Sequence, residues 1–442
     1  MSQIEFPEKG ISREEILTTL RSIRTGDADW KHGRMFSLVY NAGEEVEKVA
    51  GEAFALFMNE NALSPFAFPS LLKMETEVVS MMANLLGGDS ETVGFMTSGG
   101  SESIMLSVKT ARDFARARRP EIVNPELIMP GSAHPAFNKA AHYLGLKTVV
   151  VPTDKSLSAD VKAISRAINE NTIMLIGSAF SYPHGIIDPI ADMAQIASKN
   201  GIWMHVDACV GGLILPFLTK LGYPIPPFDF HIPGVNSMSA DIHKYGFTPK
   251  GASTILYRSA ELRQYQIFAY ADFPGGAYAT PNVLGSRPGG PMAASWAIMK
   301  YLGVEGFKRL AKTTIDTTKR LIQGIESIPG LYVLGKPPAT VFAFSSDVLN
   351  VFALGEKMKR FGWNIDSQHM PPSLHMTVFP VHATIVESFI SDLRVVVKEV
   401  AAMKPEDITG DAAMYGMIGS MPDRSMVRDF AIQYLNDLYR VR

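Results

Sequence analysis

Cysteine is almost absent from this sequence, since Cys209 is the only one among 442 residues. A single cysteine excludes an intramolecular disulfide and a cysteine-rich metal site, and it suits a reducing compartment. We therefore expect a cytoplasmic protein that carries no metal.

Long apolar runs and an excess of either charge are also missing. No run approaches the ~20 apolar residues of a membrane span, and the segment from Met1 to Gly10 lacks the basic start and apolar core of a secretory leader. The net charge is −2, and 19% charged with 46% hydrophobic residues is the composition of an ordinary globular protein. We expect neither an integral membrane segment nor a nucleic-acid partner.

Glycine and proline divide the chain into three regions. Residues 1–60 form an N-terminal arm with helical stretches, residues 61–303 a large domain and residues 304–442 a smaller α+β domain. In the large domain short apolar runs alternate with amphipathic stretches, which is typical of an α/β fold with a mostly parallel sheet between helices. The expected helices of the arm are residues 13–23 and 44–59, and the expected strands are residues 93–97, 127–129, 148–151, 173–178, 203–206 and 253–257.

The most informative stretch runs from Ala240 to Gly246 and places Lys244 directly behind His243. An upstream predicted strand leads into Asp207. A lysine amine forms a Schiff base with the aldehyde of pyridoxal 5'-phosphate (PLP), and a carboxylate keeps the pyridine nitrogen of PLP protonated. Most lysines are solvated surface charges, but Lys244 lies on a turn between a run of small residues and a predicted buried strand. The pairing predicts a PLP site that contains Lys244 and Asp207.

Two loops that follow predicted strands contain groups suited to phosphate or to an aromatic ring. Ser98, Gly99, Gly100 and Ser101 open a predicted helix, where amides and hydroxyls bind anions. The same residues also fit a simple helix N-cap. His134 is placed to stack on a flat ring, although an ordinary turn histidine fits the pattern as well.

Two further segments each allow more than one interpretation. Asp207 either caps the next turn or pairs with a protonated pyridine, which would offset the cost of burying its charge. Ala208 is small enough to leave room for the second face of the ring. Farther along, Gly285, Ser286 and Arg287 combine flexible backbone with one cation, which suits a phosphate, a carboxylate or a contact with another subunit.

Together these motifs resemble the sphingosine-1-phosphate lyases, a family of fold-type I PLP-dependent enzymes within the group II decarboxylase superfamily. The resemblance runs from about residue 33 to the end of the chain. It implies the PLP-dependent transferase fold with a seven-stranded sheet, and a homodimer whose site lies at the subunit interface. The segments that carry it are residues 97–103, 132–139, 205–208, 241–251, 274–276, 285–289 and 415–417.

The resemblance also implies roles for individual residues. Lys244 would carry the cofactor, Asp207 would hold its pyridine nitrogen and His134 would stack on its ring. The groups that hold the cofactor phosphate would be Ser98, Gly99, Gly100, Ser101 and His243. The substrate and proton-transfer groups would be Lys250, Tyr182, Tyr415 and, from a second subunit, Tyr40.

The implied reaction is retro-aldol cleavage of a phosphorylated sphingoid base to a long-chain aldehyde and phosphoethanolamine. The chain departs from the family pattern at Ser64, where a histidine is usual, and in the bulky residues before Tyr40. Without the membrane anchor of the eukaryotic members it looks like the soluble bacterial form. A PLP-dependent amino-acid decarboxylase fits the same cofactor motifs, because both reactions leave a carbanion beside the same Schiff base. A catalytically idle binding protein is a third hypothesis, which the presence of Lys244 and Asp207 disfavours.

Overall fold

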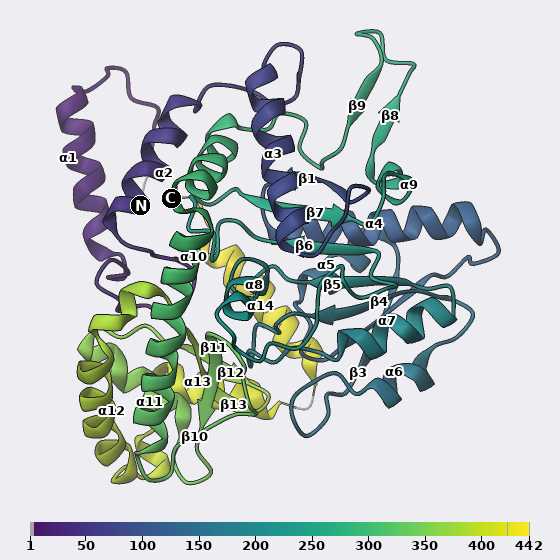
Figure 1. Ribbon diagram of the computed structural model, residues 1–442. Coiled ribbons are helices and arrows are strands. Elements are labelled where there is room, and N and C mark those ends of the chain that lie inside the picture. Colours follow the sequence, from purple (N-terminus) through teal and green to yellow (C-terminus); the bar gives the residue numbers. More distant parts are fainter. Residues whose placement is uncertain (1–3, 422, 442) are drawn as a thin grey trace.

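Seven strands form the central sheet of the computed structural model, which describes residues 4–421 and 423–441 (Figure 1). Their order is β1-β7-β6-β5-β4-β2-β3, and only β7 runs antiparallel to its neighbours. This confirms the predicted mostly parallel, seven-stranded sheet. The strands are β1 (Val93–Thr97), β2 (Glu126–Pro130), β3 (Lys147–Val151), β4 (Thr172–Ser178), β5 (Trp203–Asp207), β6 (Ser237–Ala240) and β7 (Ser253–Tyr257).

Helices cover both faces of this sheet (Figure 1). They are α3 (Pro69–Leu85), α4 (Gly100–Arg118), α5 (Ala136–Leu144), α6 (Val161–Ala167), α7 (Ile190–Lys199), α8 (Leu215–Lys220), α9 (Ala260–Arg263) and α10 (Gly289–Glu326). On one face, Trp203 and Ile255 pack in the apolar cluster formed with α4 and α5. On the other, Val206 and Met238 pack in the cluster formed with α3, α7, α8 and α10. The strands are therefore buried on both sides.

Six strands match the predicted ones to within one residue at each end, but the sequence did not predict β6. The run Ser237-Met238-Ser239-Ala240 contains no β-branched or aromatic residue, so its strand propensity is low. Its serines are instead partners of polar groups on β5. Ser237 Oγ accepts a hydrogen bond from Trp203 Nε1 at 2.8 Å, and the two ring nitrogens of His205 lie 2.8 Å and 3.2 Å from the hydroxyls of Ser237 and Ser239.

The C-terminal part forms a smaller α+β domain around an antiparallel sheet of order β10-β11-β13-β12. Its core contains Phe344, Trp363 and Phe389. The connection is α10, which departs from helical geometry at Gly303 (φ 53°), and we propose the domain boundary after that residue. The elements are β10 (Tyr332–Val333), β11 (Val341–Ser345), α11 (Val351–Met358), β12 (Asp366–His369), β13 (Pro372–Thr377), α12 (Val386–Ala401), α13 (Gly410–Ser420) and α14 (Arg424–Leu438).

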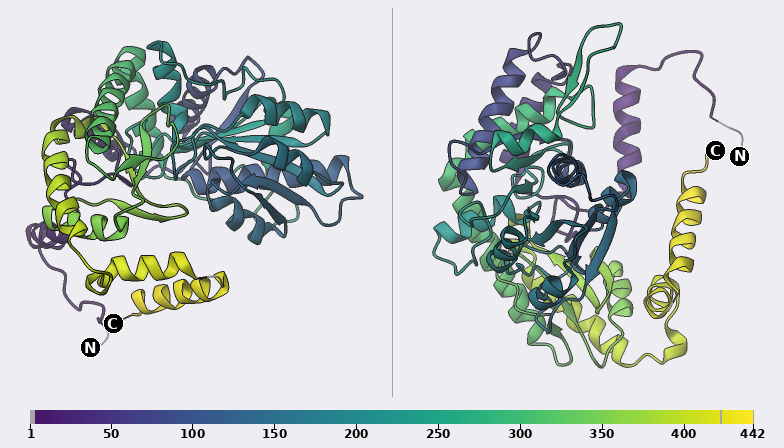
Figure 2. Two further views of the ribbon diagram at one scale, coloured as in Figure 1. Left: turned by 90° about the horizontal axis from the view of Figure 1, so that it is seen from below. Right: turned by 90° about the vertical axis from the view of Figure 1, so that its right-hand side faces the viewer.

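Helices α1 (Arg13–Ile23) and α14 and one β-hairpin project from this body. In the arm, α1 has the predicted bounds and α2 (Glu44–Leu56) ends slightly earlier than predicted. Helices α1 and α14 bury none of their residues and stand beside the body in Figure 2. A hairpin of β8 (Phe268–Tyr270) and β9 (Tyr278–Thr280) extends beyond the sheet in Figure 1. Between α1 and α2 the arm is anchored by Phe36, which is fully buried in the core of the small domain.

Candidate active site

The carboxyl ends of β4 and β5 and the start of α4 meet around a cavity of about 370 Å³. This is the edge of a parallel sheet at which α/β proteins bind ligands. The structure brings predicted site residues from separate segments together on its wall, namely Ser98, Gly99, Gly100, Ser101, His134, Tyr182, Asp207, His243 and Lys244.

Lys244 is held on this wall by Asp241, for which the sequence motif predicted no role of its own. Lys244 Nζ lies 2.8 Å from Asp241 Oδ2, and Asp241 Oδ1 has no hydrogen-bond partner among the described residues. Burial alone would raise the pKa of Asp241, but the charges of Lys244 and His243 hold it well below its ordinary value. Burial alone would lower the pKa of Lys244, and the Asp241 carboxylate outweighs this and raises it. The pair is therefore ionised.

Asp207 is a buried carboxylate, one oxygen of which has no hydrogen-bond donor among the described residues. Its Oδ1 accepts hydrogen bonds from Cys209 N at 3.0 Å and from Ser239 Oγ at 3.3 Å, while no described residue donates to Oδ2. Behind Ser239, burial lowers the pKa of His205 to about 4, so that imidazole is neutral. A buried carboxylate oxygen without a donor fits a protonated ring nitrogen in the cavity.

The loop before α4 has the properties of an anion site. The first amides of a helix have no acceptor within the helix and carry the positive end of its dipole. Gly100 is required here by space, because a Cβ at this position would lie 2.8 Å from Asp241 Oδ2 and 3.0 Å from Cys209 Sγ. These amides and the neighbouring His243 therefore fit a phosphate group.

Two further residues were predicted to contact the cofactor ring. His134 presents a neutral ring to the cavity, whereas Ala208 does not line it. His134 Nδ1 accepts a hydrogen bond from Ala136 N at 3.1 Å, and burial, followed by the charge of Lys244, lowers the pKa of the imidazole. Ala208 is fully buried in the core and does not line the cavity, whereas Cys209 and Val210 do. Successive side chains at the end of a strand point to opposite faces, so the alternation that begins at Asp207 was the available signal.

Lys250 and Tyr40 form a pair next to the cavity. Lys250 Nζ donates a hydrogen bond to His243 O at 3.1 Å and lies 5.2 Å from the centre of the Tyr40 ring. Burial and the charge of Lys244 lower the pKa of Lys250 to about 8, while burial raises the pKa of Tyr40 to about 12. Tyr40 packs on Tyr245 of its own chain, with ring centres 5.1 Å apart. Within one chain Tyr40 thus lies beside Lys250 of the same subunit, and a contribution of Tyr40 from a second subunit stays a prediction.

Tyr182 and Tyr415 are separated. Tyr182 lines the cavity, stacks on His375 and donates a hydrogen bond from its hydroxyl to Asp366 Oδ2 at 3.1 Å. Burial, reinforced by Asp366, raises its pKa. Tyr415 instead stacks on His369 and lines an adjoining cavity of about 580 Å³, which shares Tyr182 with the first. The structure does not bring Tyr415 to the wall that holds Lys244.

The two remaining motifs lie outside the cavity. Ser64, at the position where the family pattern has histidine, is exposed and accepts a hydrogen bond from Ala67 N at 3.3 Å. Arg287, the cation of the predicted anion loop, forms a buried ion pair with Glu75, with 2.7 Å between Nη1 and Oε1. The Arg287 guanidinium is therefore paired inside the protein, and binding of a phosphate or carboxylate by that loop stays a prediction.

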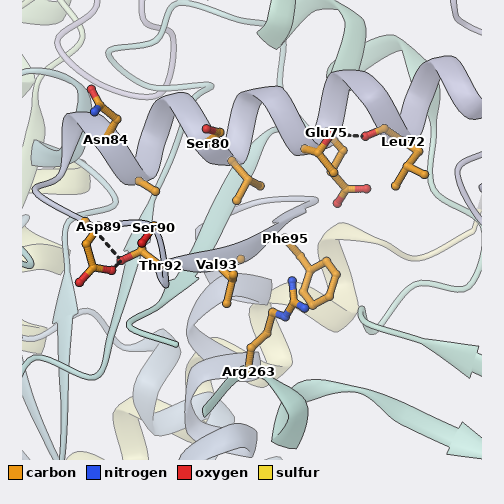
Figure 3. A pocket seen from close by; sticks show the side chains of 15 residues that line it. Leu72, Glu75, Ser80, Asn84, Asp89, Ser90, Thr92, Val93, Phe95 and Arg263 are labelled. Atoms are coloured by element: carbon orange, nitrogen blue, oxygen red, sulfur yellow. Dashed lines mark hydrogen bonds between the residues drawn. The ribbon is translucent and has the colours of Figure 1, made fainter. Parts of the chain in front are cut away.

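A larger cavity, of about 660 Å³, lies between α3 and β1. Figure 3 shows Leu72 and Glu75 on α3 facing Phe95 on β1, with Arg263 below them. None of the predicted cofactor or catalytic residues lines this cavity. Volume alone is therefore a poor guide to the site of chemistry in this protein.

Comparison with known proteins identifies the family. A family model described as the pyridoxal-dependent decarboxylase conserved domain matches residues 2–346. A sphingosine-1-phosphate lyase of Oryza sativa subsp. japonica is 43% identical over 440 residues, which are 98% of this chain and 81% of that protein. This chain belongs to the sphingosine-1-phosphate lyase family. A solved sphingosine-1-phosphate lyase of Burkholderia pseudomallei K96243 superposes on this lyase-family chain with a TM-score of 0.91 at 37% identity, covering 100% of this chain and 98% of that one.

A probable L-aspartate decarboxylase of Pyrococcus abyssi is 33% identical over 397 residues, which are 89% of this chain and 100% of that protein. The chain is accordingly a PLP-dependent lyase with the fold-type I architecture. The unpartnered oxygen of Asp207, the glycine-lined helix start and Lys244 fit that cofactor. Among the described residues, no helix is both long and apolar enough to cross a membrane.

Proposed function

We propose that this lyase cleaves the bond between C2 and C3 of a phosphorylated sphingoid base, giving a long-chain aldehyde and phosphoethanolamine. The observation that carries the proposal is similarity to sphingosine-1-phosphate lyases along nearly the whole chain. The cavity supports it, because Lys244, Asp207 and an anion-binding helix start share one wall.

We assign the cofactor-binding roles as follows. Lys244 holds the aldehyde carbon of PLP, Asp207 accepts the hydrogen bond of its pyridine nitrogen and His134 lies against its ring. The phosphate is held by Ser98, Gly99, Gly100, Ser101 and His243. When bound, PLP supplies an electron-poor ring that stabilises the charge left at C2 after cleavage.

Lys250 is our candidate for the base that removes the proton from the substrate 3-hydroxyl. A general base works best when its pKa lies near the working pH, and the pKa of Lys250, about 8, meets this condition. Tyr40, with a pKa of about 12, keeps its proton at neutral pH and serves as a hydrogen-bond donor beside Lys250. Tyr182 stays protonated for the same reason and is oriented by Asp366. In this assignment Tyr415 contributes only to the adjoining cavity.

We further propose a cytoplasmic homodimer with its sites near the subunit interface. An isolated helix shorter than about 12 residues is marginal in water, yet α1 exposes Ile16, Leu20 and Ile23. The hairpin β8–β9 likewise exposes Phe268 and Tyr270. Light scattering should give about twice the chain mass of 48.4 kDa, and a monomeric mass would reject the dimer. The cytoplasmic location follows from the near absence of cysteine, and cell fractionation tests it.

An amino-acid decarboxylase is the second candidate function. The description of the matched family model and the similarity to the Pyrococcus abyssi protein favour it. The two reactions differ in their products, so mass spectrometry after incubation of the PLP-loaded protein separates them. Sphingosine 1-phosphate should yield aldehyde and phosphoethanolamine, while aspartate, glutamate and aromatic amino acids should yield no carbon dioxide. The opposite pattern would assign the protein to the decarboxylases.

A further inference from the structure

Glu102, in the first turn of α4, is a buried carboxylate that joins two distant segments. It is 8% exposed, and its Oε2 accepts a hydrogen bond from Ser98 N at 2.6 Å. Its Oε1 accepts from Val283 N at 2.9 Å and from Leu284 N at 3.4 Å. None of the described lysines, arginines or histidines forms an ion pair with it, so the backbone N–H groups are its partners.

The first of these bonds fixes the orientation of the anion loop. Because the N–H of Ser98 is directed at Glu102, it is not available to a ligand in the cavity. The hydroxyl of Ser98 and the amides at the start of α4 are left for the phosphate. On the far side of the loop, the hydroxyls of Thr97 and Ser103 lie 2.6 Å apart and support the same backbone conformation.

The second pair of bonds reaches the segment that follows the projecting hairpin. Residues 282–284 follow β9 after Pro281, and Asn282 Nδ2 donates a hydrogen bond to Met96 O of β1 at 2.8 Å. The end of the hairpin is thus tied to β1 by Asn282 and to the anion loop by Glu102. Both ties lead to the strand and loop on which the proposed phosphate site is built.

The buried carboxyl group of Glu102 needs these hydrogen-bond donors. A carboxylate beside a phosphate site would repel the phosphate and would be costly to bury. Hydrogen bonds from backbone N–H groups stabilise the ionised form of a carboxyl group. In this structure both oxygens of Glu102 face backbone amides in the wall of the cavity.

We propose that Glu102 is a positioning residue, whose carboxylate holds the anion loop and residues 282–284 as one unit, so that binding of PLP also orders the base of the β8–β9 hairpin. This inference rests on the role that the proposed function gives to the anion loop. The order of the hairpin base would then depend on PLP, although the hairpin itself projects away from the sheet.

The test is Glu102→Gln, studied without any substrate. Glutamine has the same shape, but its amide nitrogen is a donor, so it can serve the N–H of Ser98 or those of residues 283 and 284, and not both. We expect PLP affinity, titrated by cofactor absorbance, to weaken about tenfold, which is about 1.4 kcal/mol. We also expect PLP to slow amide hydrogen exchange of residues 282–285 in the wild type and to leave it unchanged in the variant.

Glu126→Gln is the matched control. Glu126 lies on β2, outside the cavity, and is 6% exposed. It accepts hydrogen bonds from Lys147 and Asn169. The Glu126 variant should keep wild-type PLP affinity and wild-type exchange at residues 282–285. If Glu102→Gln does not fold, Glu102→Asp takes its place, because the shorter side chain keeps the charge but cannot span both segments.

The outcomes separate this inference from the proposed function. A wild-type protein that binds no PLP would overturn the cofactor site and this inference with it. If the wild type binds PLP, then wild-type affinity together with unchanged slowing of exchange in the Glu102 variant overturns the role of Glu102 alone. Weaker binding with loss of the slowing supports it.

Discussion

The buried ion pair between Glu75 and Arg287 leads to a stability prediction that the structure makes quantitative. Arg287 Nη1 lies 2.7 Å from Glu75 Oε1, and the side chains are 11% and 8% exposed. Glu75 projects from α3 toward β1 (Figure 3), where Oε1 also accepts a hydrogen bond from Met96 N at 3.0 Å. Replacing Glu75 by glutamine would leave the Arg287 cation in the interior without its counter-charge.

Removing one partner of a buried pair costs about 3–5 kcal/mol. An unfolding entropy of about 2.1 cal/mol/K per residue amounts to roughly 0.9 kcal/mol/K for 442 residues. We therefore expect Glu75→Gln to lower Tm by about 3–5 °C. The control is the exposed pair of Lys31 and Glu47, whose side chains are 50% and 46% exposed. Glu47→Gln should change Tm by less than about 1 °C.

Differential scanning calorimetry of the PLP-free protein measures both variants under the same conditions. The double variant Glu75→Met, Arg287→Met should recover most of the lost Tm, because it removes both charges together. A Glu75→Gln protein that melts like the wild type but binds PLP or substrate more weakly would contradict this role of the ion pair. It would mean that Arg287 serves a ligand and that Glu75 is not its essential partner.

Three further predictions concern the site and the response of the protein to pH. Because only the neutral amine of Lys250 is a base and its pKa is lowered to about 8, kcat/KM should rise with pH through about 8; Lys250→Arg should abolish that rise in the pH–rate profile and lower kcat by about 100-fold or more. Asp207→Asn should still bind PLP but lower kcat by about 100-fold or more, because an amide does not hold the pyridine proton. Burial lowers the pKa of His382 from 6.5 to about 4, so the unfolded state binds more protons in this window and stability is lost as pH falls from about 6.5 toward 4; calorimetry should show a smaller decline for His382→Gln. A pH-independent rate, normal turnover of Asp207→Asn or an unchanged pH slope for His382→Gln would contradict the respective prediction.

The sheet was predictable where burial alone selects the residues. Strands buried on both faces, such as β4 and β7, are short apolar runs bounded by turn residues, and this pattern is visible locally. Strand β6 was not predictable in this way. Its serines are selected by Trp203 and His205 on the neighbouring strand, and a pattern within one segment carries no information about such partners.

Site residues were likewise predictable where a local pattern indicates them and not where their partners lie on distant segments. Lys244, Asp207 and the loop from Ser98 to Ser101 were predictable because each follows or precedes a strand and has the residue types that its chemistry needs. Glu102 was not, since two of its three hydrogen-bond donors lie in residues 282–284. Tyr40 joins the site through a tertiary contact with Tyr245 that no local pattern encodes.

Glu75 and Ala208 are intermediate cases. Glu75 falls in the apolar stripe of α3 together with Leu71 and Val78, and a charge inside such a stripe indicates a buried partner. For Ala208, strand alternation after Asp207 would have excluded it from the cavity and favoured Cys209. Both patterns were present in the sequence. Using them required the expected burial of a position to be combined with the chemistry of its side chain.

The most direct test of the central claim is the product stoichiometry of the PLP-loaded protein with sphingosine 1-phosphate, measured by mass spectrometry for the wild type and for Lys244→Ala. We expect the wild type to form equal amounts of long-chain aldehyde and phosphoethanolamine, and Lys244→Ala to form neither. Release of carbon dioxide from an amino acid in place of these products, or equal product formation by both proteins, would contradict this expectation.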